Sequence, residues 1–280
     1  MIETRDLTKT FDNFIAVDSL NLKIEKGEFF GLLGENGAGK TTTISLLSTL
    51  LLPTKGEILI DGQQLTRQRP DLKRKISVIT QEYSMRQDMN MDEIMEYQGR
   101  LYFMPRKQIK ERTEELLEFC DLLKFRKRTV RKLSGGMKRK LMVCRALLTD
   151  PEILLLDEPT AGMDALSRRQ MWNLLRKLNE KNLTILLTTH YMEEAQSLCN
   201  RVALMDHGKL EEVSTPSALI ESLGAYAVDE MTADGTQNHY FHTRQEAIRY
   251  LEELTGQASL RETTLEDVFV ERAGKHLISK

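Results

Sequence analysis

The sequence has few cysteines. Three occur among the 280 residues, at Cys120, Cys144 and Cys199. They are far apart, and their spacing matches neither a metal-binding motif nor a disulfide framework. The sequence therefore favours a reducing compartment such as the cytosol, where thiols stay reduced.

Long hydrophobic runs are also missing. A membrane-spanning helix needs roughly 20 largely apolar residues in a row, and no stretch approaches that length. The N-terminal sequence MIETRDLTKTF is charged and strand-like, which is not the pattern of a signal peptide. We therefore expect a cytoplasmic protein, and any work at a membrane would require another protein as its anchor.

An excess of charge of one sign is absent too. The 40 Lys and Arg residues nearly balance the 42 Asp and Glu residues, for a net charge of −2. This balance argues against a dedicated nucleic-acid partner, although local basic patches remain possible. The chain length suits one large domain, or one domain with a small appendage.

Apolar runs and helical patterns alternate along most of the chain. The pattern predicts parallel βαβ units, with strands buried on both faces. The runs lie at 29–33, 75–80, 153–156, 183–187 and 202–205, and the expected helices lie near 40–52, 135–148, 165–179 and 192–198. Segments at 1–30 and 56–65 alternate like exposed strands, 84–130 reads as an inserted helical segment, and 219–280 reads as a small α+β appendage.

A glycine-rich segment follows the first apolar run. Residues 34–41, GENGAGKT, match the P-loop pattern and lie between an expected strand and an expected helix, as that motif requires. Its glycines let backbone N–H groups point at phosphate oxygens, and the helix dipole adds to the attraction. Lys40 would reach the β- and γ-phosphates, and Thr41 would offer a hydroxyl to Mg²⁺. The expected nucleotide-binding residues are Asn36, Gly37, Ala38, Gly39, Lys40, Thr41 and Thr42.

Three other apolar runs also end in polar residues. Asp157 and Glu158 follow 153–156, Gln81 follows 75–80, and His190 follows 183–187 after two threonines. Ligands of open α/β sheets bind at these carboxyl ends, so the endings indicate one nucleotide site. Asp157 would hold Mg²⁺ or its water, Glu158 would orient or deprotonate the attacking water, Gln81 would contact Mg²⁺ and that water, and His190 would bind the γ-phosphate.

The motifs together resemble the ATP-binding cassette (ABC) transporter ATPases over about residues 1–218. They are GENGAGKTT at 34–42, Gln81, LSGGMKRK at 133–140, ILLLDEPTAGMD at 153–164 and TTH at 188–190. The resemblance implies a P-loop NTPase core with a mainly parallel sheet, an N-terminal antiparallel β subdomain and a helical subdomain at about 84–150. A C-terminal accessory domain would occupy 219–280.

The resemblance also implies a divided ATP site. Phe11 matches the aromatic residue that stacks on adenine, and Asp164 matches a loop aspartate that communicates between paired cassettes. Ser134, Gly135 and Gly136 match the signature that grips the γ-phosphate of ATP held by the opposite subunit. The family uses ATP and Mg²⁺, pairs its cassettes head to tail and drives separate polytopic permease subunits. A homodimer on the cytoplasmic face of the membrane is therefore expected.

Two motifs indicate which kind of transporter the chain would serve. LSGGMKRK, together with TTLEDVFVERAG at 263–274, is similar to exporter ATPases of the antibiotic-resistance type. The substrate is not visible in the sequence, because the permease would select it. The alternative is a single-cassette ATPase that acts on nucleic acid or in translation.

Two segments leave alternatives open. Residues 126–140 contain eight Lys and Arg residues and no acidic residue, and would form a solvated face, a membrane-facing patch or a nucleic-acid site. Residues 85–104 are rich in methionine and aromatic residues, which would serve partly as core and partly as a docking groove for the membrane partner.

His239 and His242 would point to opposite faces of a strand, so a shared metal is not expected.

Overall fold

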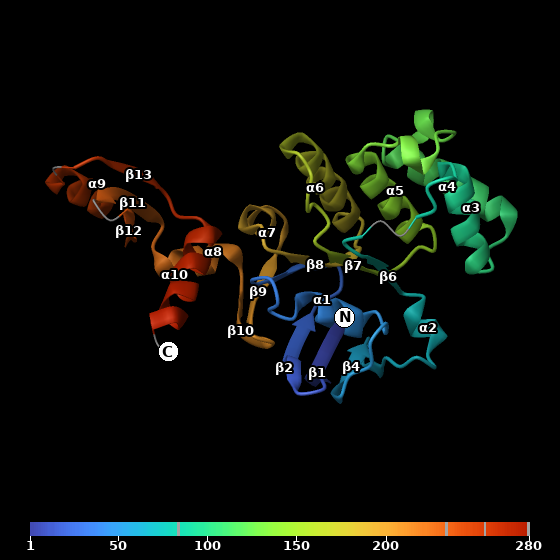
Figure 1. Ribbon diagram of the computed structural model, residues 1–280, viewed down its shortest axis with the longest axis horizontal. Helices are drawn as coiled ribbons and strands as arrows, with labels where there is room; N and C mark the ends of the chain where they lie inside the picture. The colour runs from blue at the N-terminus through green and yellow to red at the C-terminus, as the bar shows by residue number, and fades with distance from the viewer. Residues whose placement is uncertain (83–84, 233–234, 255, 279–280) are drawn as a thin grey trace. The chain divides into compact units, whose positions relative to one another are not determined.

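The computed structural model describes residues 1–82, 85–232, 235–254 and 256–278 of the chain, and the side chains up to residue 272 (Figure 1). The chain forms two compact units. The first contains Met1–His190 and Ala203–Glu212, and the second contains Tyr191–Val202 and Val213–Lys280. The second unit therefore holds more than the expected 219–280 segment.

A six-stranded sheet forms the centre of the first unit, in the order β10-β9-β3-β8-β7-β6. The strands are β3 Phe29–Leu33, β6 Ile76–Ile79, β7 Ile153–Asp157, β8 Thr184–Thr189, β9 Arg201–Asp206 and β10 Lys209–Ser214. The pairs β3–β8, β8–β7 and β7–β6 are parallel. Every residue of β3, β7 and β8 is buried, as expected for strands covered on both faces. The expected α/β fold with a mainly parallel sheet is confirmed.

A second, antiparallel sheet has the order β2-β1-β4-β5. Its strands are β1 Ile2–Phe11, β2 Phe14–Ile24, β4 Lys55–Ile60 and β5 Gln63–Gln64. Helix α1, Lys40–Leu47, contacts both β2 of this sheet and β7 of the central sheet. In Figure 1 the strands β1, β2 and β4 lie below the central sheet. The first helix thus starts between two sheets, with its N-terminus at the P-loop.

The helical part of the first unit lies above the central sheet in Figure 1. It contains α3 Met91–Leu101, α4 Arg106–Phe119, the short 3₁₀ turns η1 Leu123–Phe125 and η2 Val130–Lys132, and α5 Gly135–Leu147. Helices α2 Pro70–Lys73 and α6 Ala165–Asn179 complete the unit. Helix α3 starts with a capping box in which Asn90 and Glu93 each accept the other's backbone N–H. Three of the methionines, Met85, Met91 and Met95, are buried in this part.

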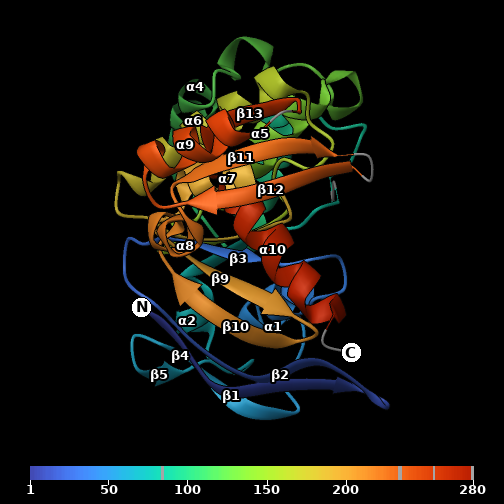
Figure 2. The same ribbon diagram turned by 90° about the vertical axis from the view of Figure 1, so that its left-hand side faces the viewer.

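The second unit combines helices with a three-stranded antiparallel sheet (Figure 2). The elements are α7 Met192–Leu198, α8 Pro216–Leu223, β11 Tyr226–Thr232, β12 Gly235–Phe241, α9 Arg244–Glu253, β13 Ala258–Glu262 and α10 Leu265–Ile278. Strand β11 lies in the middle, and α9 contacts all three strands. His239 on β12 bonds Glu230 at 3.2 Å and Tyr250 of α9 at 3.1 Å, so its partners are protein groups. Within the described residues, no helix is long and apolar enough to cross a membrane.

An ion cluster holds α10 against the sheet of the second unit. Arg261 of β13 donates two hydrogen bonds of 2.7 Å to Asp267 of α10 and a third of 2.7 Å to Asp229. The Asp267 carboxylate also accepts the Thr264 N–H at 2.7 Å, while the Thr264 hydroxyl accepts the Asp267 N–H at 3.4 Å, which forms a capping box at the start of α10. Burial alone would raise the pKa of Asp267, but the bonds from Arg261 and Thr264 outweigh it and hold the pKa below its usual range.

We expect Asp267→Asn to destabilise the second unit by about 2 kcal/mol at pH 7, because charged hydrogen bonds contribute about that much. A depressed carboxyl pKa stabilises the fold fully above the unfolded value near pH 4, and this stabilisation is lost progressively as pH falls from there through the lower pKa of the folded state. Calorimetric unfolding at pH 7 and pH 3 should therefore show a difference from wild type that shrinks at pH 3. Asp88→Asn, which removes an exposed partner of Arg86, is the control and should change little. An equal difference at both pH values would contradict this assignment.

Candidate functional site

The P-loop connects β3 to α1 and wraps around its own lysine. Gly37 and Gly39 have φ values of 88° and 103°, which favour glycine. A side chain at Gly39 would also collide with the carbonyl oxygen of Ala16. Lys40 Nζ donates to the carbonyl oxygens of Gly34 at 2.8 Å and Glu35 at 2.9 Å. The backbone needed at a phosphate site is therefore already formed.

Lys40 is a buried cation in this loop. Burial lowers its pKa, although the carboxylates of Glu158, Asp157 and Glu35 act in the opposite direction. A bound phosphate would add negative charge beside the ammonium group and favour its charged form. The loop thus provides both the N–H groups and the positive charge that phosphate requires.

Asp157 ends β7 in a buried, hydroxyl-rich position. Its Oδ1 accepts hydrogen bonds from Thr41 Oγ1 at 3.1 Å and Thr188 Oγ1 at 2.6 Å. These are hard oxygen donors, and Mg²⁺ in nucleotide sites takes one or two such protein oxygens together with phosphates and water. The donor set at Asp157 therefore fits a nucleotide-bound Mg²⁺.

Glu158 is fixed by its backbone and by its side chain. Its φ of 45° lies in the left-handed region, which is unfavourable for a residue with a side chain. Its N–H donates to the Thr188 carbonyl at 3.1 Å, and its Oε1 lies 3.1 Å from His190 Nδ1. The predicted base and the predicted γ-phosphate ligand are thus direct neighbours.

These residues surround one cleft of about 560 Å³. Its lining is Phe14, Ala16, Asn36, Gly37, Gly39, Lys40, Thr41, Thr42, Gln81, Glu158, Ala161 and His190. The structure therefore brings together most of the P-loop, Gln81, Glu158 and His190, while Asp157 lies behind them, bonded to Thr41. Ala38 is buried instead, and its carbonyl accepts the Gly208 N–H at 3.0 Å.

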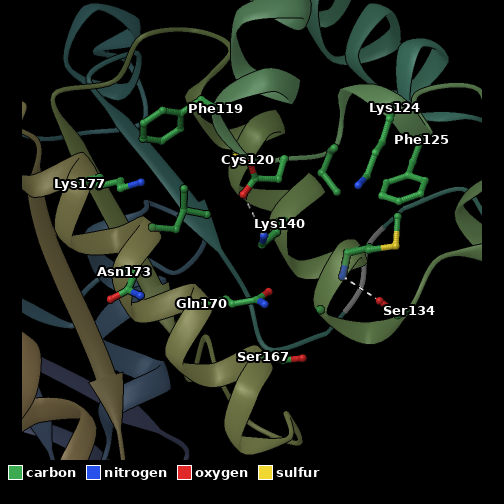
Figure 3. A pocket seen from close by; sticks show the side chains of 15 residues that line it. Phe119, Cys120, Lys124, Phe125, Ser134, Lys140, Ser167, Gln170, Asn173 and Lys177 are labelled. Carbon is green, nitrogen blue, oxygen red and sulfur yellow. Dashed lines mark hydrogen bonds and ion pairs between the residues drawn. The ribbon is translucent and has the colours of Figure 1, made fainter.

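The signature residues Ser134 and Gly136 lie elsewhere, along a second pocket of about 520 Å³ (Figure 3), and Gly135 between them is the first residue of α5. Ser134 caps α5 by accepting the Met137 N–H at 3.3 Å. Ser134 and Gly136 line this pocket with Ser167 and Gln170 of α6, and none of them lines the cleft that contains Lys40. One chain therefore carries the two halves of the predicted ATP site on separate surfaces.

Asp164 is placed beside the signature by helix α6. It caps this helix: Oδ1 accepts the Ser167 N–H at 2.8 Å and Oδ2 accepts the Ser167 hydroxyl at 2.7 Å. The backbone bond from Ser167, with the hydroxyl bond second, holds the pKa of Asp164 below its usual range. A side chain at Gly136 would lie 3.2 Å from the same Ser167 hydroxyl. Ser167 thus connects the loop aspartate with the signature glycine.

Comparison with known proteins identifies the family. The family model described as "ABC transporter" matches residues 17–161. The chain belongs to this family. It is 35% identical to the Nod factor export ATP-binding protein I of Cupriavidus metallidurans, over 99% of this chain and 98% of that protein. It is 39% identical to the daunorubicin/doxorubicin resistance ATP-binding protein DrrA of Streptomyces peucetius, over 80% of this chain and 68% of that protein.

Solved cassettes share the fold. The dimeric cassette MJ0796, in a post-hydrolysis state bound to ADP and Pi, is 28% identical, with a TM-score of 0.69 over 77% of this chain and 98% of its own. An ATP-binding subunit of another ABC transporter is 25% identical, with a TM-score of 0.70 over 79% and 92%. The expected P-loop NTPase architecture and ATPase class are thereby confirmed.

The adenine-stacking residue of this cassette remains a prediction. Phe11 and Phe14 face each other at the end of the β1–β2 hairpin. Phe14 lines the Lys40 cleft, whereas Phe11 carries the Lys9 ammonium 4.9 Å from its ring centroid. The resemblance implied Phe11 for this role, and Phe14 was not among the predicted residues because only the hairpin geometry brings it to the cleft.

The basic stretch at 126–140 also differs from a simple solvated face. Arg126 and Lys127 form ion pairs of 2.8 and 2.9 Å with Asp92. Lys140 lies 3.8 Å from Asp121, and Arg139 is buried with 2% of its surface exposed. The acidic partners come from distant positions in the sequence, so the charge run alone did not reveal them.

Proposed function

We propose that this cassette is the ATP-hydrolysing subunit of an exporter that works as a pair of identical chains with polytopic permease subunits. The observation that carries the proposal is the separation of the two half-sites. Lys40, Glu158 and His190 line one cleft, and Ser134 and Gly136 line another. A second copy placed head to tail would bring each signature to the other chain's phosphates. The dimeric solved cassette supports this arrangement.

The chemistry follows from the side chains of the cleft. Lys40 and the P-loop N–H groups would hold the phosphates, and Asp157, Thr41 and Gln81 would hold Mg²⁺, which neutralises charge on the β- and γ-phosphates. Glu158 would take a proton from the attacking water, because its carboxylate lines the cleft and His190 fixes its position. His190 would bind the γ-phosphate through its remaining ring nitrogen.

Export is proposed from the relatives. Those described above are named for Nod factor export and for daunorubicin/doxorubicin resistance. The linearmycin resistance protein LnrL of Bacillus subtilis is 34% identical over 84% of this chain. In this reading the cassette is peripheral on the cytoplasmic face of the membrane, and the permease selects the substrate.

A groove in the first unit offers a docking site for the permease. It holds about 490 Å³ and lies between α3 and the edge strand β6. Its rim includes Leu50, Leu101, Tyr102 and Phe103, all exposed, with Phe103 at 89%. Exposed apolar groups gathered in a groove mark an interaction site. The buried methionines of 85–95 serve the core, so the docking role falls to the aromatic end of α3.

We expect Phe103→Asp or Tyr102→Asp to abolish transport and membrane association, because an aspartate in the groove would lose its hydration on docking. ATP hydrolysis by the isolated cassette should stay within about twofold of wild type, since surface changes away from the cleft alter stability little. The measurements are ATPase rates of the isolated cassette and drug efflux with permease-containing membranes. Met231→Asp, at an exposed site of the second unit, is the control. Loss of soluble ATPase activity along with transport would show that the groove supports folding instead of docking.

A further inference from the structure

A buried arginine connects the signature helix to the catalytic strands. Arg139 lies in the second turn of α5, and its side chain is 2% exposed. Nη1 donates to the carbonyl oxygen of Thr80 at 2.8 Å, and Nη2 donates to the carbonyl oxygen of Glu158 at 3.1 Å. A guanidinium suits this role because its planar fork can bond two acceptors in fixed directions.

The two carbonyls belong to Glu158 itself and to the residue directly before Gln81. Thr80 follows the end of β6 and directly precedes Gln81, which lines the ATP cleft. Glu158 follows β7 and has the left-handed φ of 45°. Such a backbone persists only where the surroundings hold it. Thr188 fixes the N–H of Glu158, and Arg139 fixes its carbonyl from the other side.

We propose that Arg139 is a positioning residue for hydrolysis: it fixes Glu158 and Gln81 of its own chain against the helix that carries the signature. Arg139 touches neither nucleotide nor water in this role. It acts through two peptide groups, so its loss would let Glu158 leave its strained backbone and shift the carboxylate. The inference rests on the proposed roles of Glu158 and Gln81 in ATP hydrolysis.

The alternative is that Arg139 only stabilises the fold. The chain offers a matched control in Arg112 of α4, whose Nη2 donates to the carbonyl oxygen of Leu147 at 3.2 Å, at the other end of α5. Arg112 also pairs with Glu115 at 2.8 Å and with Asp150 at 3.2 Å, and none of these three residues lines the Lys40 cleft. Arg112→Gln therefore removes an arginine–carbonyl bond to the same helix without touching a catalytic strand end.

The first test compares kcat, KM for ATP and melting temperature. We expect Arg139→Met to lower kcat by roughly 10- to 100-fold, because a displacement of about 1 Å of a catalytic group can have such an effect. KM should stay near the wild-type value, since the P-loop is untouched. Arg139→Lys should fall between, because a single ammonium lacks the planar fork in which each Nη atom reaches one of the two carbonyls. Arg112→Gln should lower the melting temperature while kcat of the folded protein stays unchanged.

Three results would overturn the proposal: a folded Arg139→Met or Arg139→Lys protein with wild-type kcat, an equal loss of kcat in Arg112→Gln, or a loss of ATP binding that accounts for the whole effect. If Arg139→Met does not fold, Arg139→Lys decides the outcome. Mg-ATP-dependent dimerisation of Glu158→Gln, measured by light scattering, tests the paired cassette of the proposed function separately from the positioning role of Arg139. A cassette that never dimerises refutes the paired site, whereas one that dimerises but hydrolyses normally without Arg139 refutes only the positioning role.

A second test asks which chain Arg139 serves. In a mixed dimer of one Ser134→Arg chain and one Lys40→Met chain, the single intact site takes Glu158 from the Ser134→Arg chain and the signature from the Lys40→Met chain. Adding Arg139→Met to the Ser134→Arg chain should lower the restored ATPase activity by the same factor of roughly 10 to 100. Adding it to the Lys40→Met chain should leave most of that activity. The reverse result would place Arg139 in the signature half-site and overturn positioning within its own chain.

Discussion

Replacing Glu158 with glutamine is expected to lower steady-state ATP hydrolysis by about 100-fold or more and to leave a stable, ATP-bound dimer. A general base contributes about 10²- to 10⁴-fold to a rate, and an amide cannot accept the proton of the attacking water. The amide has nearly the same shape and can still bond His190, so the cleft and its affinity for ATP should persist. Phosphate release and size-exclusion light scattering, with and without Mg-ATP, measure the two effects.

The matched control for this change is Glu152→Gln. Glu152 immediately precedes β7, at the end of the strand opposite Glu158, and forms exposed ion pairs with Lys26 and Lys75. Its replacement removes the same charge from the same strand without reaching the cleft, so activity should be unchanged. A Glu158→Gln protein that hydrolyses ATP normally and stays monomeric at saturating Mg-ATP would refute both the catalytic role and the paired-cassette proposal.

Much of this site could be predicted because it is encoded locally. The P-loop needs a strand, a glycine turn and a helix that follow one another directly, and all three are visible in 29–47. Asp157, Glu158, Gln81 and His190 were found by their positions just after buried strands, since parallel strands deliver their carboxyl ends to one edge of the sheet. The sequence pattern also marked β7, β8 and helix α6 within a residue or two.

The residues that were missed depend on distant partners. Arg139 was one of eight Lys and Arg residues in the basic stretch at 126–140, and only the fold turns it inward to Thr80 and Glu158. Phe14 directly follows the turn of the β1–β2 hairpin, and its approach to the cleft depends on how that hairpin folds. The extent of the second unit also depends on residues that are far apart in the sequence. Helix α7 contacts α10, and the Gln196 side chain of α7 accepts the Leu265 N–H of α10 at 2.9 Å.

Two inactive variants are expected to restore each other's activity when they are mixed. Ser134→Arg should place a bulky cation where the partner's γ-phosphate would bind, and Lys40→Met should remove the cation that holds the chain's own phosphates. Each variant alone should lose at least about 100-fold of its ATPase activity, because both sites of its dimer carry the same defect. Ser134→Arg should still bind one ATP per chain, since its P-loop is intact.

Mixing the two proteins creates heterodimers with one intact site, in which Lys40 of the Ser134→Arg chain faces Ser134 of the Lys40→Met chain. Restored activity should rise with the heterodimer fraction and stay below the wild-type rate, because the second site combines both defects. In the control, the Ser134→Arg protein is mixed with a Glu152→Gln/Ser134→Arg double variant. Both chains then lack an intact signature, so mixing should restore no ATPase activity. If mixing restores no activity although heterodimers form, the two halves of the site do not meet across chains. If instead Ser134→Arg alone is active, the signature binds no partner phosphate and the separation of the two pockets has another cause.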